Sequence, residues 1–294
     1  MSTDKVIAYG GQAVIEGVMM RGSHVMAVAV RAPDRRIVLH TQPLSAIYRN
    51  RVSKLPFVRG LIGLWDALVL GWQGLSFSVN VAGGEEVKIE GPVAWGTIAL
   101  SLIFGVGLFF LAPAAVAQLS ETWLGVNSFL GNVLEGLIRL GLVIGYMWLI
   151  GLMPDIRRLY GYHGAEHKTI NAFEAGADLT PESVARFPLE HPRCGTAFLL
   201  TVVIFSILLF ALLGPLPIWA RLLSRVLLIP AVAGLAFEYI RFTARRLANP
   251  IVKFLLVPNL ALQRLTTREP DASMLEVAIA AFNAMREKET LVVA

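Results

Sequence analysis

Residues 91–120 read GPVAWGTIALSLIFGVGLFFLAPAAVAQLS, and none of these 30 consecutive side chains is charged. An α-helix rises 1.5 Å per residue, so about 20 apolar residues cross the hydrocarbon core of a bilayer. The stretch therefore predicts a transmembrane helix, and the rest of the chain has to fit that class of protein.

Three further apolar runs follow. Residues 140–154 carry no charge but are few, and extending the run back to 135 brings in Glu135 and Arg139, which are four positions apart and can pair on one helix face. Two more runs lie closer to the C-terminus. We therefore predict an α-helical integral membrane protein with a membrane domain over 91–240. Its transmembrane helices, about four in number, lie at 91–120, 135–154, 196–220 and 222–240.

The composition of the whole chain supports this class. Apolar residues make up 55% of the 294 positions and charged residues 16%, whereas a soluble domain usually carries about 25% charged residues. The net charge is +5, but lysine and arginine flank the apolar runs and form no single basic face. This pattern is typical of proteins that meet anionic lipid headgroups. We expect the lipid bilayer as a partner and no nucleic acid.

The positions of lysine and arginine predict the orientation of the chain. Ten of them precede residue 91 and none lies between 91 and 138, whereas five lie between 155 and 194 and eight follow Ile240. Loops rich in these residues stay in the cytoplasm, so we predict a multi-pass protein with both termini and the loop 155–195 inside. Cys194, the single cysteine, then remains a thiol or thiolate.

The segment before the membrane domain has an ambiguous pattern. Residues 55–84 place several leucines near helical spacing, but Arg59 and Asp66 interrupt them. The segment 55–90 therefore favours an amphipathic helix that lies in the interface or re-enters the membrane, and not a fifth span.

The two ends of the chain predict a small cytoplasmic α+β layer. In the N-terminal segment 1–54, valine-rich stretches on either side of Pro33-Asp34 predict a β-hairpin over 24–43. The C-terminal segment 241–294 shows helical periodicity over 273–289 and predicts a helix there.

The stretch YHGAEHKTINAFE, residues 162–174, carries the most informative chemistry. His163, Glu166 and His167 have the H-x-x-E-H spacing of inverted zinc peptidases. Residues four apart project from one helix face, so both imidazoles can reach one metal ion. Glu166 lies beside them and is our candidate for the catalytic general base.

Other donors in the same loop can complete a metal site. Glu174 returns to the same helix face seven positions after His167, and His191 and Cys194 add a nitrogen and a sulfur. This mixed donor set favours a transition metal ion, with zinc as our first choice. The predicted ligands are His163, His167, Glu174, His191 and Cys194.

The same residues allow plainer interpretations. An H-x-x-E-H match also arises in random helices, and Gly164 between the histidines lowers helix propensity. A structural polar cluster and a metal-free acid–base site therefore stay open. Glu174 can equally be a surface carboxylate, and Cys194 a small buried residue. Three of the five histidines and the only cysteine fall within 32 residues, which favours the metal.

Three other polar positions carry expectations. Glu16, in an apolar stretch flanked by glycines, either faces the site or caps a turn. Glu238 and Arg241 are expected to pair at the inner end of the fourth run. Asp271 or Ser273 is expected to cap the C-terminal helix.

At its motifs the chain resembles the YqhQ family of bacterial membrane proteins, a family of unknown function described as predicted metal-dependent enzymes. The resemblance implies a polytopic protein of the bacterial cytoplasmic membrane with a suspected metal site at His163, Glu166, His167, His191 and Cys194. It names no substrate or reaction. The matching stretches are GGQAVIEGVMMRG (10–22), PFVRGLIGLWDALVLG (56–71), 162–174, HPRCGT (191–196) and QRLTTREPD (263–271).

Three classes of function follow from these observations. The first is a membrane-embedded, metal-dependent hydrolase that cleaves a peptide or lipid-like substrate at the cytoplasmic face, with Glu166 deprotonating water. The second is a transporter, which the scarcity of ionisable residues in the predicted spans disfavours. The third is a structural or regulatory protein whose loop is stapled by metal, for which a closed four-ligand site is expected. The oligomeric state is not predicted.

Overall fold

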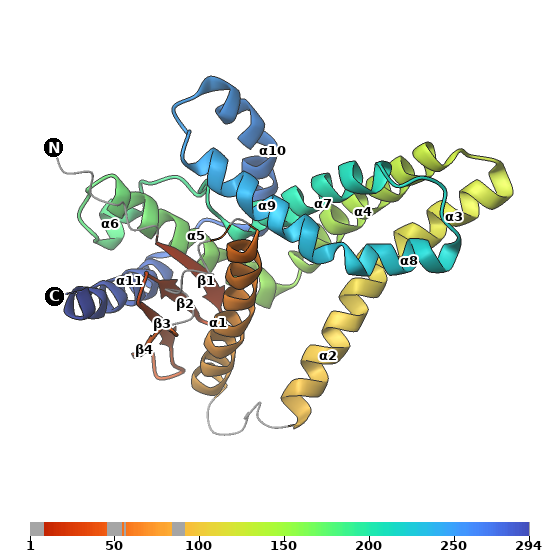
Figure 1. Cartoon of the computed structure of the whole chain (residues 1–294). Coiled ribbons are helices and arrows are strands. Elements are labelled where there is room, and N and C mark those ends of the chain that lie inside the picture. Colours follow the sequence, from red (N-terminus) through yellow and green to blue (C-terminus); the bar gives the residue numbers. More distant parts are fainter. Residues whose placement is uncertain (1–8, 46–54, 56, 84–91, 294) are drawn as a thin grey trace.

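The computed structural model describes residues 9–45, 55, 57–83 and 92–293. It contains a layered body and an apolar helical arm (Figure 1). The body holds an antiparallel sheet in the order β1-β2-β3-β4. The strands are β1 (Gly10–Val14), β2 (Gly17–Arg21), β3 (Val25–Arg31) and β4 (Ile37–Pro43). Strands β3 and β4 form the predicted hairpin, and their turn contains Pro33-Asp34.

The first two strands form a hairpin that the sequence did not predict. Strand β2 and most of β3 are buried on both faces, so their sequences lack the alternation that identifies a half-buried strand. Val14 pairs with Gly17, which leaves Ile15 and Glu16 as the turn. The Glu16 carboxylate accepts hydrogen bonds from Arg158 and from the hydroxyl of Tyr162. Glu16 thus lies at a turn, as one of its two alternatives expected.

Helices cover both faces of the sheet. Helix α1 (Val58–Ala82) packs on one face, and α5 (Pro154–Glu174) and α11 (Ala272–Val293) pack on the other. A buried apolar cluster that includes Phe282 and Met285 joins α5 and α11 to the sheet. The N–H of Met274 donates to the carboxylate of Asp271, so the expected cap of the C-terminal helix is present.

Helix α1 lies within the segment 55–90 that was predicted as an amphipathic helix, and residues 84–90 of that segment lie outside the described residues. Its buried face includes Asp66, which pairs with Arg21 of β2 at 2.5 Å, and its other side exposes Trp65. The expected pair of Glu238 with Arg241 is wrong, because Glu238 pairs with Arg59 of α1 instead. Glycine on both helices lets α1 approach the helix that carries Glu238, which brings Arg59 within reach.

The arm consists of helices from the middle of the chain. α2, the π-helical turn η4 and α3 run on without a break, and α10 leads back to the body. The bounds are α2 (Pro92–Val106), η4 (Gly107–Leu111), α3 (Ala112–Leu124), α4 (Ser128–Ile150), α7 (Gly195–Ala211), α8 (Ile218–Leu227), α9 (Ile229–Ala244) and α10 (Pro250–Thr266). A short helix, α6 (Pro181–Val184), lies between α5 and α7.

The structure supports two or three candidate membrane spans, fewer than the four predicted. Trp95–Leu124 and Ser128–Ile150 are long and apolar enough to cross a bilayer. The pair α8–α9 counts as a third only if a break bent by 43° is allowed. Pro230 lies at this break and has no N–H to donate to a continuous helix. Helix α7 is apolar but has only 17 residues, because it ends before Gly214 and two prolines.

Charged residues gather inside the arm. Glu135 and Arg139 pair at 2.6 Å, as expected, and both side chains are almost fully buried. Helix α8 adds Arg225, which pairs with Glu135 at 2.5 Å, and Arg221, which pairs with Glu121 at 2.5 Å. Arg221 lies at the junction of the predicted spans 196–220 and 222–240, where charges are expected in a turn, and Arg225 follows four positions later. Their spacing of four instead puts them on one inward-facing side of a helix.

Candidate metal centre

Helix α5 brings His163 and His167 onto one face at the junction of body and arm. The helix starts with Pro154, which suits a first turn. Gly164, the glycine that weakens the predicted helix, lies where α5 meets the chain between α10 and α11. A Cβ at this position would overlap the backbone oxygen of Arg268. The glycine therefore serves close packing, and the helical spacing of the motif is present.

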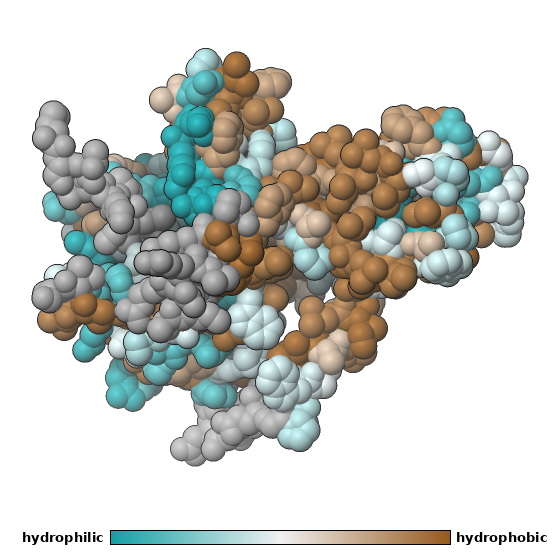
Figure 2. Space-filling view, viewed as in Figure 1, coloured by the Kyte–Doolittle hydropathy of each residue, from teal (hydrophilic) through white to brown (hydrophobic). Residues whose placement is uncertain are grey.

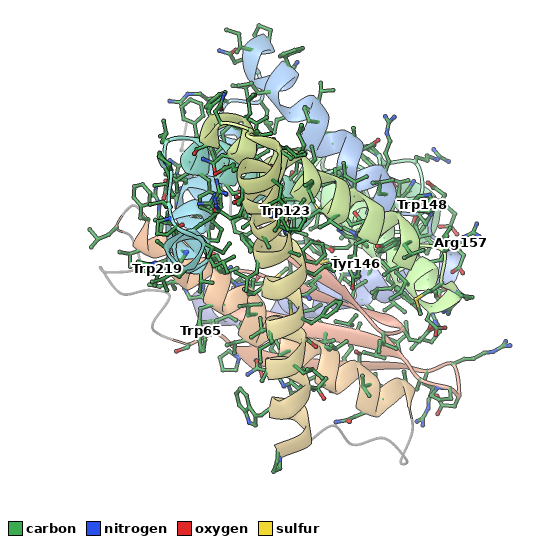
Figure 3. The ribbon with its side chains drawn as sticks, turned by 90° about the vertical axis from the view of Figure 1, so that its right-hand side faces the viewer. Trp65, Trp123, Tyr146, Trp148, Arg157 and Trp219 are labelled. Carbon is green, nitrogen blue, oxygen red and sulfur yellow. The ribbon has the colours of Figure 1, made fainter. Side chains whose placement is uncertain are left out.

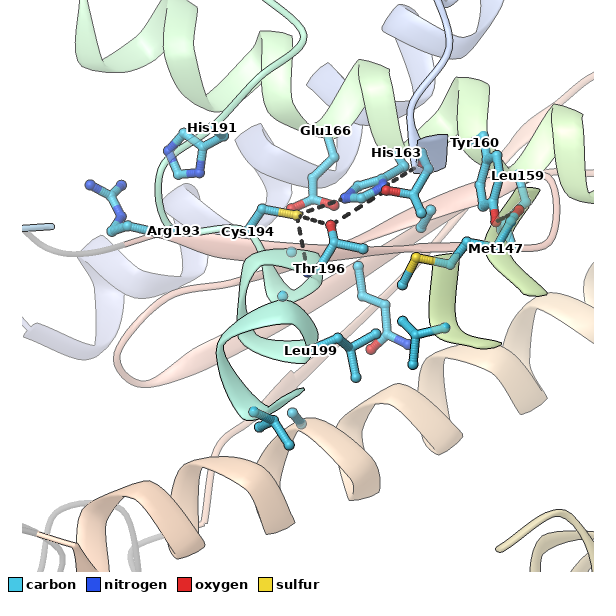
Figure 4. Close-up of a pocket in the computed structure, with 18 of the residues that line it drawn as sticks. Met147, Leu159, Tyr160, His163, Glu166, His191, Arg193, Cys194, Thr196 and Leu199 are labelled. Atoms are coloured by element: carbon cyan, nitrogen blue, oxygen red, sulfur yellow. Dashed lines mark hydrogen bonds between the residues drawn. The ribbon is translucent and has the colours of Figure 1, made fainter. Parts of the chain in front are cut away.

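Cys194 meets the two histidines. It is the residue before α7, and its Sγ lies 3.2 Å from Nε2 of His163. One donor atom each from His163, His167 and Cys194 lies within 4.8 Å of the other two (Figure 4 shows the His163–Cys194 contact). The hydroxyl and the N–H of Thr196 point at the Cys194 sulfur from 2.8 and 3.4 Å. The structure thus collects three of the predicted ligands around one point.

Backbone carbonyls fix the orientation of both imidazole rings. Nδ1 of His163 lies 2.8 Å from the oxygen of Thr266, and Nδ1 of His167 lies 2.5 Å from the oxygen of Leu189. A carbonyl only accepts, so each Nδ1 carries a proton and each Nε2 keeps its lone pair. Nε2 of His167 is buried and has no hydrogen-bond partner among the described residues. Metal-bound histidines usually donate their second ring N–H to a carbonyl or carboxylate in this way, so the residues fit a metal ion.

Glu166 lies next to this group without joining it. Its carboxylate packs against strand β1, where a Cβ added to Gly11 would lie 2.9 Å from the Glu166 Cδ. Burial raises the pKa of Glu166 to about 7, against the smaller lowering effects of His163 and the Gly11 backbone N–H. Because this pKa lies near neutrality, the carboxyl can take up and release a proton under ordinary conditions.

Glu174 and His191 lie side by side, but outside the group of three. Glu174 is seven residues after His167, which is two helix turns or about 10.5 Å along the axis, so facing the same way does not bring it to the same point. Its carboxylate pairs with Arg193 and lies 3.9 Å from Nε2 of His191. Burial raises the pKa of Glu174, but His191 and Arg193 outweigh it and lower this pKa to about 2.

His191 is held in place from behind. The amide of Gln263, itself fully buried, accepts from the His191 N–H at 2.9 Å and donates to its carbonyl at 2.8 Å. Burial lowers the pKa of the His191 imidazole, partly offset by Glu174. Its Nε2 is buried and has no hydrogen-bond partner among the described residues, and its ring centroid lies 5.7 Å from that of His167.

A cavity of about 620 Å³ opens beside the centre. One end is polar and includes His163, Glu166 and Cys194, as the close-up in Figure 4 shows. The other end runs between η4, α4 and α7, with mostly apolar walls. Sequence reasoning missed the contribution of β1, Thr196, Gln263 and Thr266 to this region. The glycine pair in GGQAV and the polar stretch QRLTT were the available signals.

Comparison with known proteins identifies the family. Residues 55–288 match the family described as "Protein of unknown function (DUF1385)". The chain is also 36% identical over 307 aligned positions to the "Uncharacterized protein YqhQ" of Bacillus subtilis (strain 168), covering 99% of this chain and 96% of that one. The chain therefore belongs to the DUF1385 family, which confirms the resemblance. No solved structure matches it.

Proposed function

We propose that this member of the DUF1385 family is a membrane-embedded, metal-dependent hydrolase that acts at the cytoplasmic face. The observation that carries the proposal is Nε2 of His167, which is buried and without a hydrogen-bond partner among the described residues, while Nδ1 is held by a carbonyl. A buried acceptor left in this state costs about 1–3 kcal/mol. A cation shared with His163 and Cys194 removes that cost.

Embedding in a bilayer accounts for the surface of the arm. Large apolar side chains such as Ile103, Trp148 and Trp219 are more than half exposed. Two helical segments, Trp95–Leu124 and Ser128–Ile150, already have the length and composition of membrane spans. In the proposed arrangement α7 and the bent pair α8–α9 complete four spans. Both termini and α5 then lie in the cytoplasm, as the distribution of lysines and arginines predicts.

His163, His167 and Cys194 would hold the metal ion. Three protein donors with a further position open to solvent or substrate are typical of catalytic zinc sites. When bound, such an ion acts as a Lewis acid on a carbonyl oxygen and lowers the pKa of water. The cavity lies against His163 and Cys194 and leaves room for a substrate on that side.

Glu166 supplies the acid–base chemistry. Its carboxylate accepts a proton from water as the water oxygen forms a bond to the substrate carbonyl carbon. The bond from that carbon to the leaving nitrogen or oxygen then breaks, and Glu166 returns the proton to the leaving group. A pKa of about 7 suits both halves of this exchange.

A structural role for the metal is the second candidate, and one observation favours it. His191 also buries an Nε2 without a partner among the described residues. If its ring turned toward His167, the set would have four protein donors, which is the pattern of structural zinc sites. A transporter is not proposed, because Arg139, Arg221 and Arg225 are already engaged with carboxylates.

Metal analysis of the purified full-length protein tests the proposal. We expect about one equivalent of transition metal in the wild-type chain. The double variant His163→Ala, His167→Ala should lose it, while His40→Ala, which changes a histidine on β4, should keep it. Full metal content in the double variant would refute the centre.

The variant Glu166→Gln then distinguishes a catalytic metal site from a structural one. The amide keeps the size of the side chain but accepts no proton. Metal content should therefore hold and the melting temperature should not fall, while rescue of a deletion phenotype falls by about 10²- to 10⁴-fold. Full rescue with metal retained excludes Glu166 as the base. A joint loss of metal and stability supports the structural role.

A further inference from the structure

Strand β1 is an edge of the sheet. Within the part of the chain that the structure describes, it pairs with β2 alone. Val14 and Gly17 close the two-residue turn, and in an antiparallel ladder hydrogen-bonded and non-hydrogen-bonded pairs alternate from there. The register therefore directs the N–H and C=O groups of Gly11 and Ala13 away from β2.

This edge faces the cavity beside the metal centre. Residues 10–13 of β1 line it together with His163 and Glu166 of α5. Gly11 and Gln12 are exposed there. Proteins usually protect such an edge with lysine, proline or a bulge, because exposed N–H and C=O groups invite another strand. Strand β1 carries none of these and reads GGQAV.

The remaining walls of the cavity are mostly apolar, with Arg139 among them. They come from the arm and include Phe110, Val143, Met147, Leu199 and Val203. Tyr146 and Leu199 are exposed where the cavity opens between α4 and α7. The volume of about 620 Å³ falls in the usual range of ligand-binding cavities. One wall thus offers backbone hydrogen bonds, and the others offer hydrocarbon contact.

We infer that the substrate is an extended, mostly apolar peptide segment that adds to the free edge of β1 as a fifth strand. The inference rests on the proposed hydrolase and names its substrate class. A hydrocarbon chain of a lipid laid along β1 would bury the outward C=O of Gly11 and the outward N–H and C=O of Ala13 without partners, whereas the Gly11 N–H already faces the Glu166 carboxylate. A peptide backbone pairs with these groups, and its alternate side chains reach the apolar walls.

The same geometry places the bond to be cleaved. A strand alongside Gly11 passes Glu166, whose carboxyl carbon lies 2.9 Å from where a Cβ on Gly11 would be, with the Gly11 N–H beside the carboxylate. The amide opposite Gly11 is then the one next to the base and to His163. Gly11 carries no side chain into this space, where a Cβ would meet both Glu166 and the backbone oxygen of Met19.

Peptide binding to the wild-type full-length protein in lipid nanodiscs tests the inference. The probe is a fluorescein-labelled peptide of alternating valine and alanine, followed by fluorescence anisotropy. Two further peptides carry N-methyl groups, one on all the valines and one on all the alanines. Alternate N–H groups of a strand point to opposite edges, so one of these peptides should bind about tenfold more weakly while the other binds normally.

Two protein variants provide a matched control. Ala13→Pro removes an outward N–H and is tolerated on a strand edge, whereas Ala13→Ser keeps this N–H. We expect weaker binding only with proline. If all three peptides bind equally, or none binds, no strand forms on β1 and the inference fails. Displacement of the probe by a single-chain lysophospholipid, with no effect of N-methylation, would instead identify a lipid site.

Metal analysis on the same samples separates this inference from the proposed function. If binding depends on whether the valines or the alanines are N-methylated, but the protein holds no metal, the strand site is supported and the proposed hydrolase is excluded. If the protein holds metal but peptide binding does not depend on which residues are methylated, the proposed hydrolase stands and the strand site is excluded.

Discussion

The body and the arm differ in the side chains that fill most of their interiors and cover their surfaces. In the body, apolar residues such as Val18, Phe282 and Met285 are buried. In the arm, the largest fully buried side chains include Arg139 and Arg225, and apolar residues cover the outside (Figure 2). Water drives apolar groups inward, whereas lipid exerts no such force and leaves only charged groups in need of internal partners. One chain therefore folds as if for two solvents.

Aromatic residues mark the outside of the arm. Figure 3 shows Trp123, Trp148 and Trp219 on its helices, and each is more than half exposed. Tryptophan gathers where membrane meets water. The candidate centre lies between the two regions, since α5 belongs to the body and Cys194 precedes α7 of the arm.

The largest expected loss of stability comes from breaking the buried ion pairs of the arm. Glu135→Gln leaves Arg139 and Arg225 buried without their shared carboxylate, which should lower the free energy of unfolding by about 3–5 kcal/mol. Asp34→Asn removes the partner of Arg36 in an exposed pair of the body and should leave the free energy of unfolding nearly unchanged, because water screens this pair. Unfolding by detergent titration measures both, and equal losses would contradict the contrast.

A second pair of variants tests the outer surfaces. Ile103→Asp places a charge on an exposed apolar position of the arm and should cost about 2.5–3.5 kcal/mol in membrane insertion. Leu39→Asp makes the same change on exposed strand β4 of the body and should change stability by about 0.5 kcal/mol or less. The membrane-inserted fraction of each variant is the measurement. Normal insertion of Ile103→Asp would place the arm in water.

A third effect is a pH dependence of the free energy of unfolding that arises in the body alone. The pKa of Glu166 is raised from 4.5 to about 7, so the unfolded chain loses this proton first as the pH rises. The contribution of this group to stability is therefore full below pH 4.5 and is lost between 4.5 and about 7, by on the order of 3 kcal/mol. Unfolding of chelator-treated protein at several pH values measures it. Glu166→Gln should flatten the curve, and an unchanged curve would show that Glu166 is not buried as described.

The sequence predicted what depends on local spacing. The four-residue interval placed His163 and His167 on one helix face, and unusual clustering singled out Cys194. Helical spacing shows which residues share a face but not how far apart they lie along the helix axis. It therefore could not show that Glu174 lies two turns beyond His167, too far to join the metal ligands.

The features that the sequence did not predict depend on tertiary packing. Strand β2 is buried on both sides and lost the alternating pattern, so the edge strand β1 beside it went unpredicted. Arg221 and Arg225 resembled loop charges, because an inward charged face is the reverse of the usual amphipathic helix. Both misses come from assuming one solvent and one buried face for every element.

X-ray absorption at the metal edge of the purified full-length protein tests the central claim most directly. The proposed centre should show one sulfur at about 2.3 Å and two imidazole nitrogens at about 2.0–2.1 Å. Cys194→Ser should remove the sulfur and leave the nitrogens. A first shell of oxygen alone, or a sulfur signal that survives in Cys194→Ser, would contradict a centre built from His163, His167 and Cys194.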